Sequence, residues 1–499
     1  MTQQPVQPVR VRLAPSPTGT PHIGTMRQAI FDWLLARNTG GTFILRIEDT
    51  DRRRFVPTAL EEIYASLRWL GLDWDEGPDI GGPHAPYFQS ERLDLYQTEV
   101  RRLIAANDAY ECFCTPERLD TMRNRQRELK QPPHYDGRCR SEEGRAEAKR
   151  DAGAGAASVV RFAMPDTGQT VVPDFVRGDL IFENARLDDA VLLKSDGFPT
   201  YHLAMPVDDH EMAISHVIRN EEWLPSAPLH KRLFDALGYP LPVFVHTASI
   251  LGSDRAKLSK RHGAQSVLEY RDQGYLPEAV FNFLGLLGWS LDDKTEVISR
   301  DEFVQHFSIE RLIKSPAVFD LEKLNWMNGH YLRSLPPEDV TGLLTDWLER
   351  PEAAGGLPDQ VERPLDFDYT LRLVPLVRER VKLLSEARDM MAFFYLPDGV
   401  EPDPAMLLGK AFAGEPRRAA DLLSEALVLA EGVEAWTAEA IEAAYRALAE
   451  QQSVRAGELF MLVRVATTGR SVAPPLFETM ELVGRERCVL RLRLAINLL

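Results

Sequence analysis

Hydrophobic residues in the first part of the chain follow two spacings in turn. Short apolar runs at residues 9–13 and 43–47 are typical of buried strands, whereas apolar residues recur at helical spacing over 23–36 and 57–70. A loop rich in proline at 15–19 separates the first strand from the first helix. This alternation predicts a parallel, doubly wound sheet.

The alternation is interrupted in the middle of the chain and then returns. Between 95 and 193 the sequence carries cysteine pairs, a polar stretch and short strands, which indicate an inserted subdomain. Strand and helix patterns resume at 199–207 and include a helix near 227–237 and a strand at 243–246. From about residue 268 almost every segment has helical spacing.

At 499 residues the chain is too long for one hydrophobic core, and the changes of pattern predict where it divides. We expect an α/β class fold with a Rossmann-like catalytic domain in two halves. The predicted parts are the first half at 1–94, the insertion at 95–193, the second half at 194–267, a helical domain at 268–338, and an all-helical region at 339–499 with a joint near 397–404.

Composition excludes several classes of protein. A hydrophobic share of 44% and a charged share of 27% are ordinary for a folded protein, and no apolar run approaches the roughly 20 residues of a membrane span. The first residues are polar, without the features of a secretion signal, so we expect a cytoplasmic protein. A formal net charge of −17 argues against indiscriminate nucleic-acid binding but leaves room for local basic clusters at 52–54, 257–261 and 378–382.

His22 and Gly24 are the first candidates for chemistry, because they stand where a loop enters a helix. A helix N-terminus presents free N–H groups and attracts phosphate. His22 is placed to donate a hydrogen bond to a phosphate oxygen, and Gly24 leaves room for an adenine ring. A histidine that merely caps the helix is the alternative for this pair taken alone.

Lys257 and Lys260 lie on a basic loop just after the strand at 243–246. Cations at the carboxyl end of a strand suit a polyphosphate, because they neutralise the pyrophosphate as it leaves. No P-loop accompanies them, and a solvated basic turn is the alternative.

Taken together, the two motifs resemble the hallmark motifs of class I aminoacyl-tRNA synthetases. The sequences PSPTG and HIGT follow the first strand, and KLSKR follows about 235 residues later. Further blocks are most similar to the glutamyl-tRNA synthetase family: RLAPSPTG at 12–19, RIEDTD at 46–51, VLLKSDGFPTYHL at 191–203, VDDH at 207–210, VIRNEEWL at 217–224 and FDLEKLNWMN at 319–328. The resemblance covers about residues 10–330 and continues more weakly to the end.

The resemblance implies a set of site residues. The glutamate site would comprise Arg12, Ala14, Ser16, Glu48, Tyr201 and Arg219, and the ATP site Ser16, His22, Gly24, Glu222, Trp223, Lys257 and Lys260, of which His22, Gly24, Lys257 and Lys260 would act in catalysis. The charges suit the substrate, because Arg12 offers a cation for the side-chain carboxylate and Glu48 an acceptor for the ammonium group. Asn220 departs from the smaller residue that is more usual in the family at its position.

The same resemblance implies the reaction and its partners. The carboxylate of L-glutamate would attack the α-phosphorus of ATP, which enters with Mg²⁺, and the terminal adenosine of tRNA(Glu) would then displace AMP. Catalysis would rest on positioning and charge stabilisation, with no protein nucleophile and no protein metal ligand that we identify. The family favours a monomer, with 95–193 contacting the acceptor end, 268–338 the stem and 339–499 the anticodon.

Three clustered cysteines raise the possibility of zinc. Cys112, Cys114 and Cys139 resemble three ligands of a zinc site found in some bacterial members, but the fourth position is occupied by Ser141, which is a poor ligand. His134 or Tyr135 would have to complete the site. We therefore favour a metal-free subdomain with reduced thiols.

Basic residues in the helical half are candidates for tRNA binding. We expect Arg378, Arg380 and Lys382 to share one helix, where guanidinium groups suit splayed anticodon bases, although a solvated helix face is the alternative. The resemblance implies that an arginine near Arg380 distinguishes glutamate from glutamine anticodons in some members. Arg455, Arg464 and Arg470 are further candidates for stem contacts.

Several rival functions remain to be weighed. A glutaminyl-tRNA synthetase would carry β-barrel anticodon domains, and a glutamyl-queuosine tRNA synthetase would lack the helical half. A small-molecule nucleotidyltransferase leaves that half unexplained. A catalytically inactive RNA-binding paralog would be expected to have lost His22, Gly24, Lys257 or Lys260. A non-discriminating enzyme that also charges tRNA(Gln) stays open.

Overall fold

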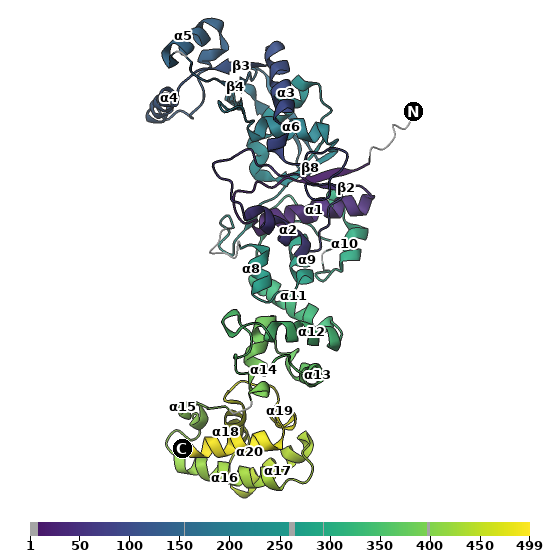
Figure 1. Cartoon of the computed structure of the whole chain (residues 1–499), viewed down its shortest axis with the longest axis vertical. Helices are drawn as coiled ribbons and strands as arrows, with labels where there is room; N and C mark the ends of the chain where they lie inside the picture. The colour runs from purple at the N-terminus through teal and green to yellow at the C-terminus, as the bar shows by residue number, and fades with distance from the viewer. Residues whose placement is uncertain (1–7, 154, 259–264, 293, 397–399) are drawn as a thin grey trace. The chain divides into compact units, whose positions relative to one another are not determined.

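The computed structural model describes residues 8–153, 155–258, 265–292, 294–396 and 400–499 of the chain (Figure 1). These residues form two compact units: unit 1 is Met1–Tyr270 with Val280–Leu321, and unit 2 is Arg271–Ala279 with Glu322–Leu499. Among the described residues, no helix is both long enough and apolar enough to cross a membrane.

A parallel arrangement of strands forms the centre of unit 1. Strand β1 (Arg10–Leu13) pairs in parallel with β2 (Thr42–Leu45). Strand β9 (Val243–Thr247) pairs in parallel with β8 (His216–Asn220) on one edge and with β5 (Gln169–Asp174) on the other. The amide of Ser215 donates to the carbonyl of Arg10 over 2.9 Å, which brings β8 beside β1. Because the strands are parallel, their carboxyl ends meet at one edge, where ligands bind in open sheets of this kind.

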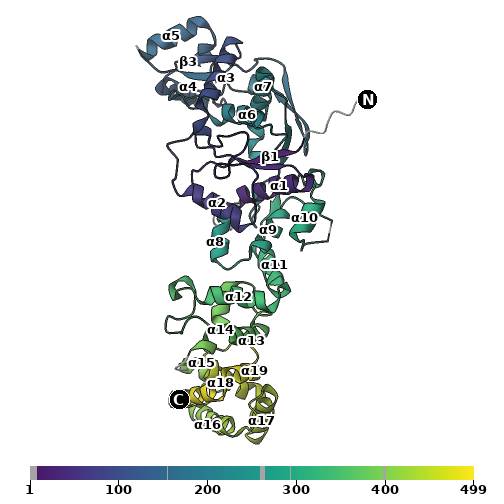
Figure 2. The same ribbon diagram turned by 45° about the vertical axis from the view of Figure 1, so that its right-hand side comes forward.

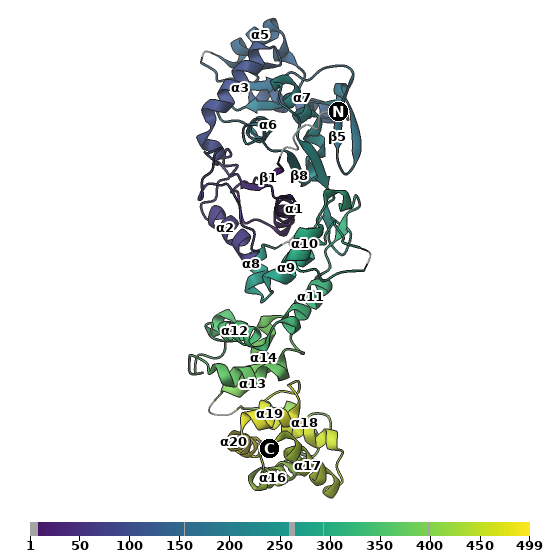
Figure 3. The same ribbon diagram turned by 90° about the vertical axis from the view of Figure 1, so that its right-hand side faces the viewer.

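Helices cover both faces of these strands, as the alternating pattern predicted. Helices α1 (Ile23–Thr39) and α2 (Ala59–Trp69) lie on one side of β1, and α6 (Tyr201–Glu211) and α7 (Ala227–Leu237) lie on the other (Figure 3). Helix α1 is buried along most of its length, begins at the cap residue His22 and ends at Gly40, whose φ of 63° suits a glycine. The α/β fold class is thereby confirmed.

Two strands of this sheet come from the range predicted as an insertion. Strand β5 lies within 95–193, yet its Asp174 pairs with Phe244 of β9, and its other edge pairs antiparallel with β6 (Gly178–Glu183). No local pattern could predict this pairing, because Asp174 and Phe244 lie 70 residues apart in the chain. The predicted domain boundaries themselves stay a prediction.

The remainder of that range is a small subdomain. Strands β3 (Ala109–Cys112), β4 (Val159–Phe162) and β7 (Val191–Leu193) form an antiparallel sheet that follows α3 (Leu93–Ala105). Helices α4 (Pro116–Glu128) and α5 (Glu142–Ala152) lie beside it (Figure 2). Nearer the end of unit 1, short strands β10 (Ile250–Leu251) and β11 (Ala317–Val318) pair in parallel.

The later part of the chain is helical, as its spacing predicted. The helices after β10 are α8 (Val267–Asp272), α9 (Pro277–Gly285), α10 (Arg300–His306), α11 (Leu321–Ser334), α12 (Pro337–Leu348), α13 (Phe367–Val377), α14 (Ala387–Tyr395), α15 (Pro404–Leu408), α16 (Pro416–Gly432), α17 (Ala438–Gln451), α18 (Ala456–Thr468), α19 (Leu476–Val483) and α20 (Arg485–Asn497). In the described part of unit 2 no strand occurs. Its last five helices pack around apolar side chains such as Leu423, Ile441 and Leu459.

Candidate active site

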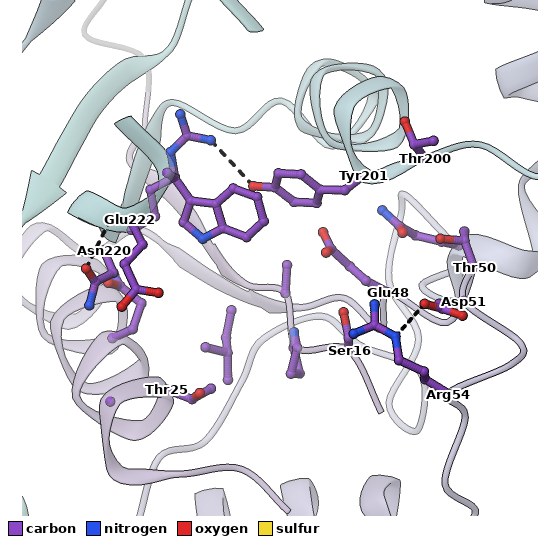
Figure 4. A pocket seen from close by; sticks show the side chains of 18 of the residues that line it. Ser16, Thr25, Glu48, Thr50, Asp51, Arg54, Thr200, Tyr201, Asn220 and Glu222 are labelled. Carbon is purple, nitrogen blue, oxygen red and sulfur yellow. Dashed lines mark hydrogen bonds and ion pairs between the residues drawn. The ribbon is translucent and has the colours of Figure 1, made fainter. Parts of the chain in front are cut away.

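A pocket of about 1190 Å³ opens at the carboxyl edge of the parallel strands of unit 1 (Figure 4). Glu222 and Asn220 lie toward one end of it, and Asp51 and Arg54 lie toward the other. The predicted site residues that line it are Arg12, Ala14, Ser16, His22, Gly24, Glu48, Tyr201, Arg219, Glu222, Trp223 and Lys257. Lys260, the remaining predicted residue of this group, lies outside the described residues.

His22 and Gly24 form one structural feature at the start of α1. The Nδ1 atom of His22 accepts a hydrogen bond from the backbone N–H of Gly24 over 3.0 Å, so a neutral ring carries its proton on Nε2. Burial lowers the pKa of His22, which favours that neutral form. A side chain at position 24 would place its Cβ 2.7 Å from Cε1 of His22, so the absence of a side chain there is what lets the ring take this position.

Glu222 and Lys257 form an exposed ion pair at one end of the pocket. The Nζ of Lys257 lies 2.7 Å from Oε1 of Glu222, and both side chains are at least half exposed. The carbonyl oxygen of the Asn220 side chain accepts from the backbone N–H of Glu222 over 3.2 Å, which starts the turn that carries Glu222 and Trp223. The ring of Trp223 lies against Tyr201 with centroids 4.2 Å apart.

A network of buried charges links Arg12 to Glu48. Arg12 and Arg46 both donate to the carboxylate of Asp209, over 3.1 Å and 2.7 Å, and Arg46 also lies 3.4 Å from Glu48. Burial raises the pKa of Glu48 to about 7 even though two arginines oppose the shift. Glu48 is therefore a buried acceptor that changes its charge near neutral pH.

Arg219 differs from Arg12 in its partners. Its Nε donates to Nε2 of His246 over 3.0 Å, and its Nη1 donates to Nδ1 of His230 over 3.0 Å and to the hydroxyl of Tyr201 over 3.4 Å. Its Nη2 has no hydrogen-bond partner among the residues that the structure describes, although the side chain is buried. Among the described residues, no carboxylate contacts this guanidinium.

Sequence reasoning overlooked several residues that line the pocket. Thr25, Gln28, Thr50 and Lys194 also face it, and Lys194 donates to the carbonyl of Thr50 over 2.8 Å. For Thr25, Thr50 and Lys194 the available signal was their position within the quoted sequence blocks, whereas Gln28 lies outside them. Arg52, Arg53 and Arg54, noticed only as a basic cluster, line the same pocket.

The three cysteines gather in the small antiparallel subdomain. Their sulfur atoms lie within 4.8 Å of one another, and those of Cys114 and Cys139 are 3.7 Å apart. The hydroxyl of Tyr135 lies 3.5 Å from the sulfurs of both Cys112 and Cys114. Ser141 is not part of the cluster, because its hydroxyl caps α5 by accepting from the N–H of Gly144 over 3.1 Å.

The expectation that Arg378, Arg380 and Lys382 share one helix is wrong. Helix α13 ends at Val377, with Arg378 as its cap residue, and the carboxylate of Glu386 accepts from the backbone N–H of Lys382 over 2.6 Å. That contact begins the next helical segment, so Arg380 and Lys382 fall in the turn between helices.

The further arginines considered for tRNA contacts are already engaged within unit 2. Arg464 donates to the carbonyls of Ala473 and Pro474. The Nη2 of Arg470 lies 2.8 Å from Oδ1 of Asp389, and Arg455 forms an ion pair with Glu458.

Two family models match this chain. Residues 8–326 match the model described as tRNA synthetases class I (E and Q), catalytic domain. Residues 339–496 match the model described as an anticodon binding domain.

Whole-chain relatives and a solved structure agree with those matches. The glutamate–tRNA ligase of Dehalococcoides mccartyi strain 195 is 50% identical over 490 residues, which are 98% of either chain. That of Acidothermus cellulolyticus is 48% identical over 98% of this chain and 95% of its own. The crystal structure of a glutamate tRNA ligase from Elizabethkingia meningosepticum, in complex with its amino acid, superposes with a TM-score of 0.85 at 36% identity and covers 98% of this chain and 99% of its own.

Proposed function

The chain belongs to the class I tRNA synthetases for glutamate and glutamine, and from this premise we propose that it joins L-glutamate to the 3′ end of tRNA(Glu) at the expense of ATP. One observation carries the proposal. A single pocket brings groups suited to the two charges of an amino acid, Arg12 and Glu48, together with groups suited to phosphate, His22 and Lys257.

The first step forms glutamyl-adenylate. An oxygen of the α-carboxylate of glutamate attacks the α-phosphorus of ATP, the bond to the β-phosphate bridging oxygen breaks, and pyrophosphate leaves. The Nε2–H of His22 is available to stabilise the negative charge that develops on the α-phosphate. Lys257 has to leave its ion pair with Glu222 in order to pair with the departing pyrophosphate. Lys260 would bind the pyrophosphate beside it.

The second step transfers glutamate to the tRNA. A hydroxyl of the terminal adenosine attacks the carbonyl carbon of the adenylate, and AMP leaves with the bonding electrons. Arg12, Ala14, Ser16, Glu48, Tyr201 and Arg219 hold the amino acid during both steps, and Ser16, Gly24, Glu222 and Trp223 hold the nucleotide. The contribution of these groups is positioning and charge.

The helical unit is proposed to hold the anticodon. The match of residues 339–496 to an anticodon binding domain supports this role, with Arg378 and Arg380 in the turn after α13 as contacts. We expect the enzyme to act as a monomer in the cytoplasm and to take ATP as its Mg²⁺ complex, with no protein ligand assigned to that ion.

In place of the metal-free subdomain that the sequence favoured, we propose that the cysteine cluster holds a structural zinc ion, with Tyr135 rather than Ser141 as the fourth ligand. Around tetrahedral zinc, two sulfurs at about 2.3 Å lie about 3.8 Å apart, and a sulfur and an oxygen about 3.5 Å apart. The separations here, 3.7 Å between Cys114 and Cys139 and 3.5 Å from Tyr135 to Cys112 and Cys114, fit that geometry. Zinc would fix the subdomain and take no part in the reaction.

Metal analysis of the purified protein tests the zinc proposal. We expect about one zinc per chain in the wild type, a marked loss in Cys139→Ser and a smaller loss in Tyr135→Phe. A metal-free wild-type protein with three titratable thiols in the cluster would contradict it.

Charging assays test the function itself. The enzyme is incubated with labelled glutamate and ATP, separately with purified tRNA(Glu) and tRNA(Gln). We expect charging of tRNA(Glu); charging of both would identify a non-discriminating enzyme. Charging of neither, with tRNA shown to be competent, would contradict the proposal and favour an inactive RNA-binding paralog.

A further inference from the structure

Arg219 stands at the centre of a chain of buried hydrogen bonds that crosses unit 1. Arg219 of β8 and His246 of β9 are directly paired residues in the sheet, so their side chains share one face. Behind His246 lies Asp174 at the end of β5, and on the other side His230 of α7 is followed by His202 of α6. The side chains of Arg219, His230, His246 and Asp174 are at most 5% exposed.

The direction of every hydrogen bond in this chain follows from the chemistry of arginine. A guanidinium only donates, so the ring nitrogens that face it, Nε2 of His246 and Nδ1 of His230, must both accept. His246 then carries its proton on Nδ1 and donates it to Asp174 over 2.6 Å. His230 carries its proton on Nε2, 3.2 Å from Nδ1 of His202.

Both histidines are therefore neutral in this arrangement. A protonated ring has no acceptor to offer and would repel the neighbouring guanidinium. Burial lowers the pKa of His230 well below its usual value, and burial also lowers that of His246 despite the opposing carboxylate of Asp174. Tyr201, the remaining hydrogen-bond partner of Arg219, is neutral as well, because burial raises its pKa.

The result is a buried cation held in place by neutral groups. Arg12, the other pocket arginine of the predicted glutamate site, has its charge offset by Asp209 at 3.1 Å. Within the described part of the chain Arg219 has no such partner: its nearest link to a carboxylate runs through His246, and its Nη2 makes no hydrogen bond. A buried, uncompensated charge is costly, and a substrate carboxylate would offset that cost on binding.

We propose that His230 and His246, backed by Asp174, are positioning residues that fix the Arg219 guanidinium without cancelling its charge, and so reserve that charge for a carboxylate of the amino-acid substrate. The proposal rests on the proposed function. It assigns a role to three residues that are not among those lining the pocket, so it differs from a general requirement for Arg219.

A matched pair of substitutions separates position from charge. His230→Gln keeps a neutral acceptor for Nη1 of Arg219, while His230→Glu keeps an acceptor of almost the same shape but adds the missing negative charge. Binding of L-glutamate and of L-glutamine is measured by calorimetry on the full chain at pH 8, alongside the KM for ATP and the unfolding temperature.

We expect His230→Gln to bind glutamate within about threefold of wild type and His230→Glu to bind it about tenfold or more weakly, with the KM for ATP alike in the two variants. Unchanged glutamine binding in His230→Glu would identify the side-chain carboxylate as the partner of Arg219, and an equal loss for glutamine would identify the α-carboxylate.

Equal glutamate affinity in the two variants would overturn the inference, whether both keep the wild-type affinity or both lose it to the same extent. An equal loss is what a purely structural role produces. Wild-type charging of tRNA(Glu) is measured in the same series. If wild type charges normally and the variants do not separate, only the inference fails. If wild type neither binds nor charges glutamate, the proposed function fails and the inference with it.

Discussion

Arg219 of unit 1 and Arg491 of unit 2 are two buried arginines that, within the described part of the chain, have no carboxylate in contact, yet they are held in different ways. Arg491 on α20 donates through Nη1 to the carbonyl of Thr467 and through Nη2 to those of Phe393 and Leu396. Arg219 is held by side chains, and its Nη2 makes no hydrogen bond to any described residue.

The difference separates a structural arginine from one available to a ligand. Backbone carbonyls at the ends of α14 and α18 occupy both terminal nitrogens of Arg491, which ties three helices together. Burial lowers the pKa of Arg491 to about 10, so it stays charged at neutral pH through these contacts. Burial and positive charge are thus insufficient to identify an arginine as part of a binding site. A side-chain nitrogen that donates no hydrogen bond and belongs to a residue lining a pocket is the more informative feature.

The largest effect is expected from removing Arg219. Arg219→Ala should lower kcat/KM for glutamate by about 1,000-fold, or about 4 kcal/mol, because a buried substrate carboxylate loses its cation. The KM for ATP should change by less than about threefold, since no phosphate contact is lost. Steady-state charging kinetics check this, and an unaltered KM for glutamate would contradict the role.

Removing Arg491 should destabilise the protein without affecting the binding of glutamate. Arg491→Met leaves three backbone carbonyls, two of them in buried residues, without this donor, so we expect the helical unit to lose about 3 kcal/mol of its free energy of unfolding while the KM for glutamate stays the same. Calorimetric unfolding of the full chain measures this.

Arg493→Met on the same helix is the matched control for Arg491→Met. The side chain of Arg493 is 60% exposed and pairs with Glu431 at the surface, so its loss should cost less than about 1 kcal/mol. Equal destabilisation by the two substitutions would show that burial of Arg491 is not what matters.

Two glycine substitutions, one in each unit, are expected to have opposite consequences. Gly24→Ala forces the His22 ring away, and we expect kcat to fall about 100-fold, as for loss of one stabilising donor. Gly342→Ala in α12 meets nothing within 4 Å and should instead stabilise the helical unit by up to about 1 kcal/mol. Full activity in Gly24→Ala would disprove the dependence on His22.

The smallest effect on catalysis concerns pH. Since burial raises the pKa of Glu48 to about 7, Glu48 loses the charge that accepts the substrate ammonium as pH falls below 7. Between pH 8 and pH 6 the ionised fraction falls about tenfold, and kcat/KM for glutamate should fall by about the same factor. The profile of Glu48→Gln should lose this step; a step that persists there belongs to another group.

Much of the fold and part of the site were predictable from the sequence. Helix α7 has the bounds that its apolar spacing predicted, and the pocket residues from Arg12 to Lys257 lie together because parallel strands share one carboxyl edge. Motifs at strand ends carry this information locally, since the loop after each strand also supplies its chemistry.

The partners of those residues were less predictable. His246 and Asp174 are brought to Arg219 by the order of β5, β9 and β8, whereas His230 reaches it from α7. No local pattern specifies either arrangement. Such contacts are tertiary, and the spacing of hydrophobic residues does not encode them.

The proposed binding mode of the amino acid and the nucleotide is tested most directly by a crystal structure with a non-reactive glutamyl-adenylate analogue in which a sulfamoyl group replaces the phosphate. We predict that the ligand ammonium lies against Glu48, that its remaining carboxylate is within hydrogen-bond distance of Arg12 or Arg219, and that the sulfamoyl group faces His22. A ligand whose carboxylate meets neither arginine and whose ammonium is remote from Glu48 would contradict the account.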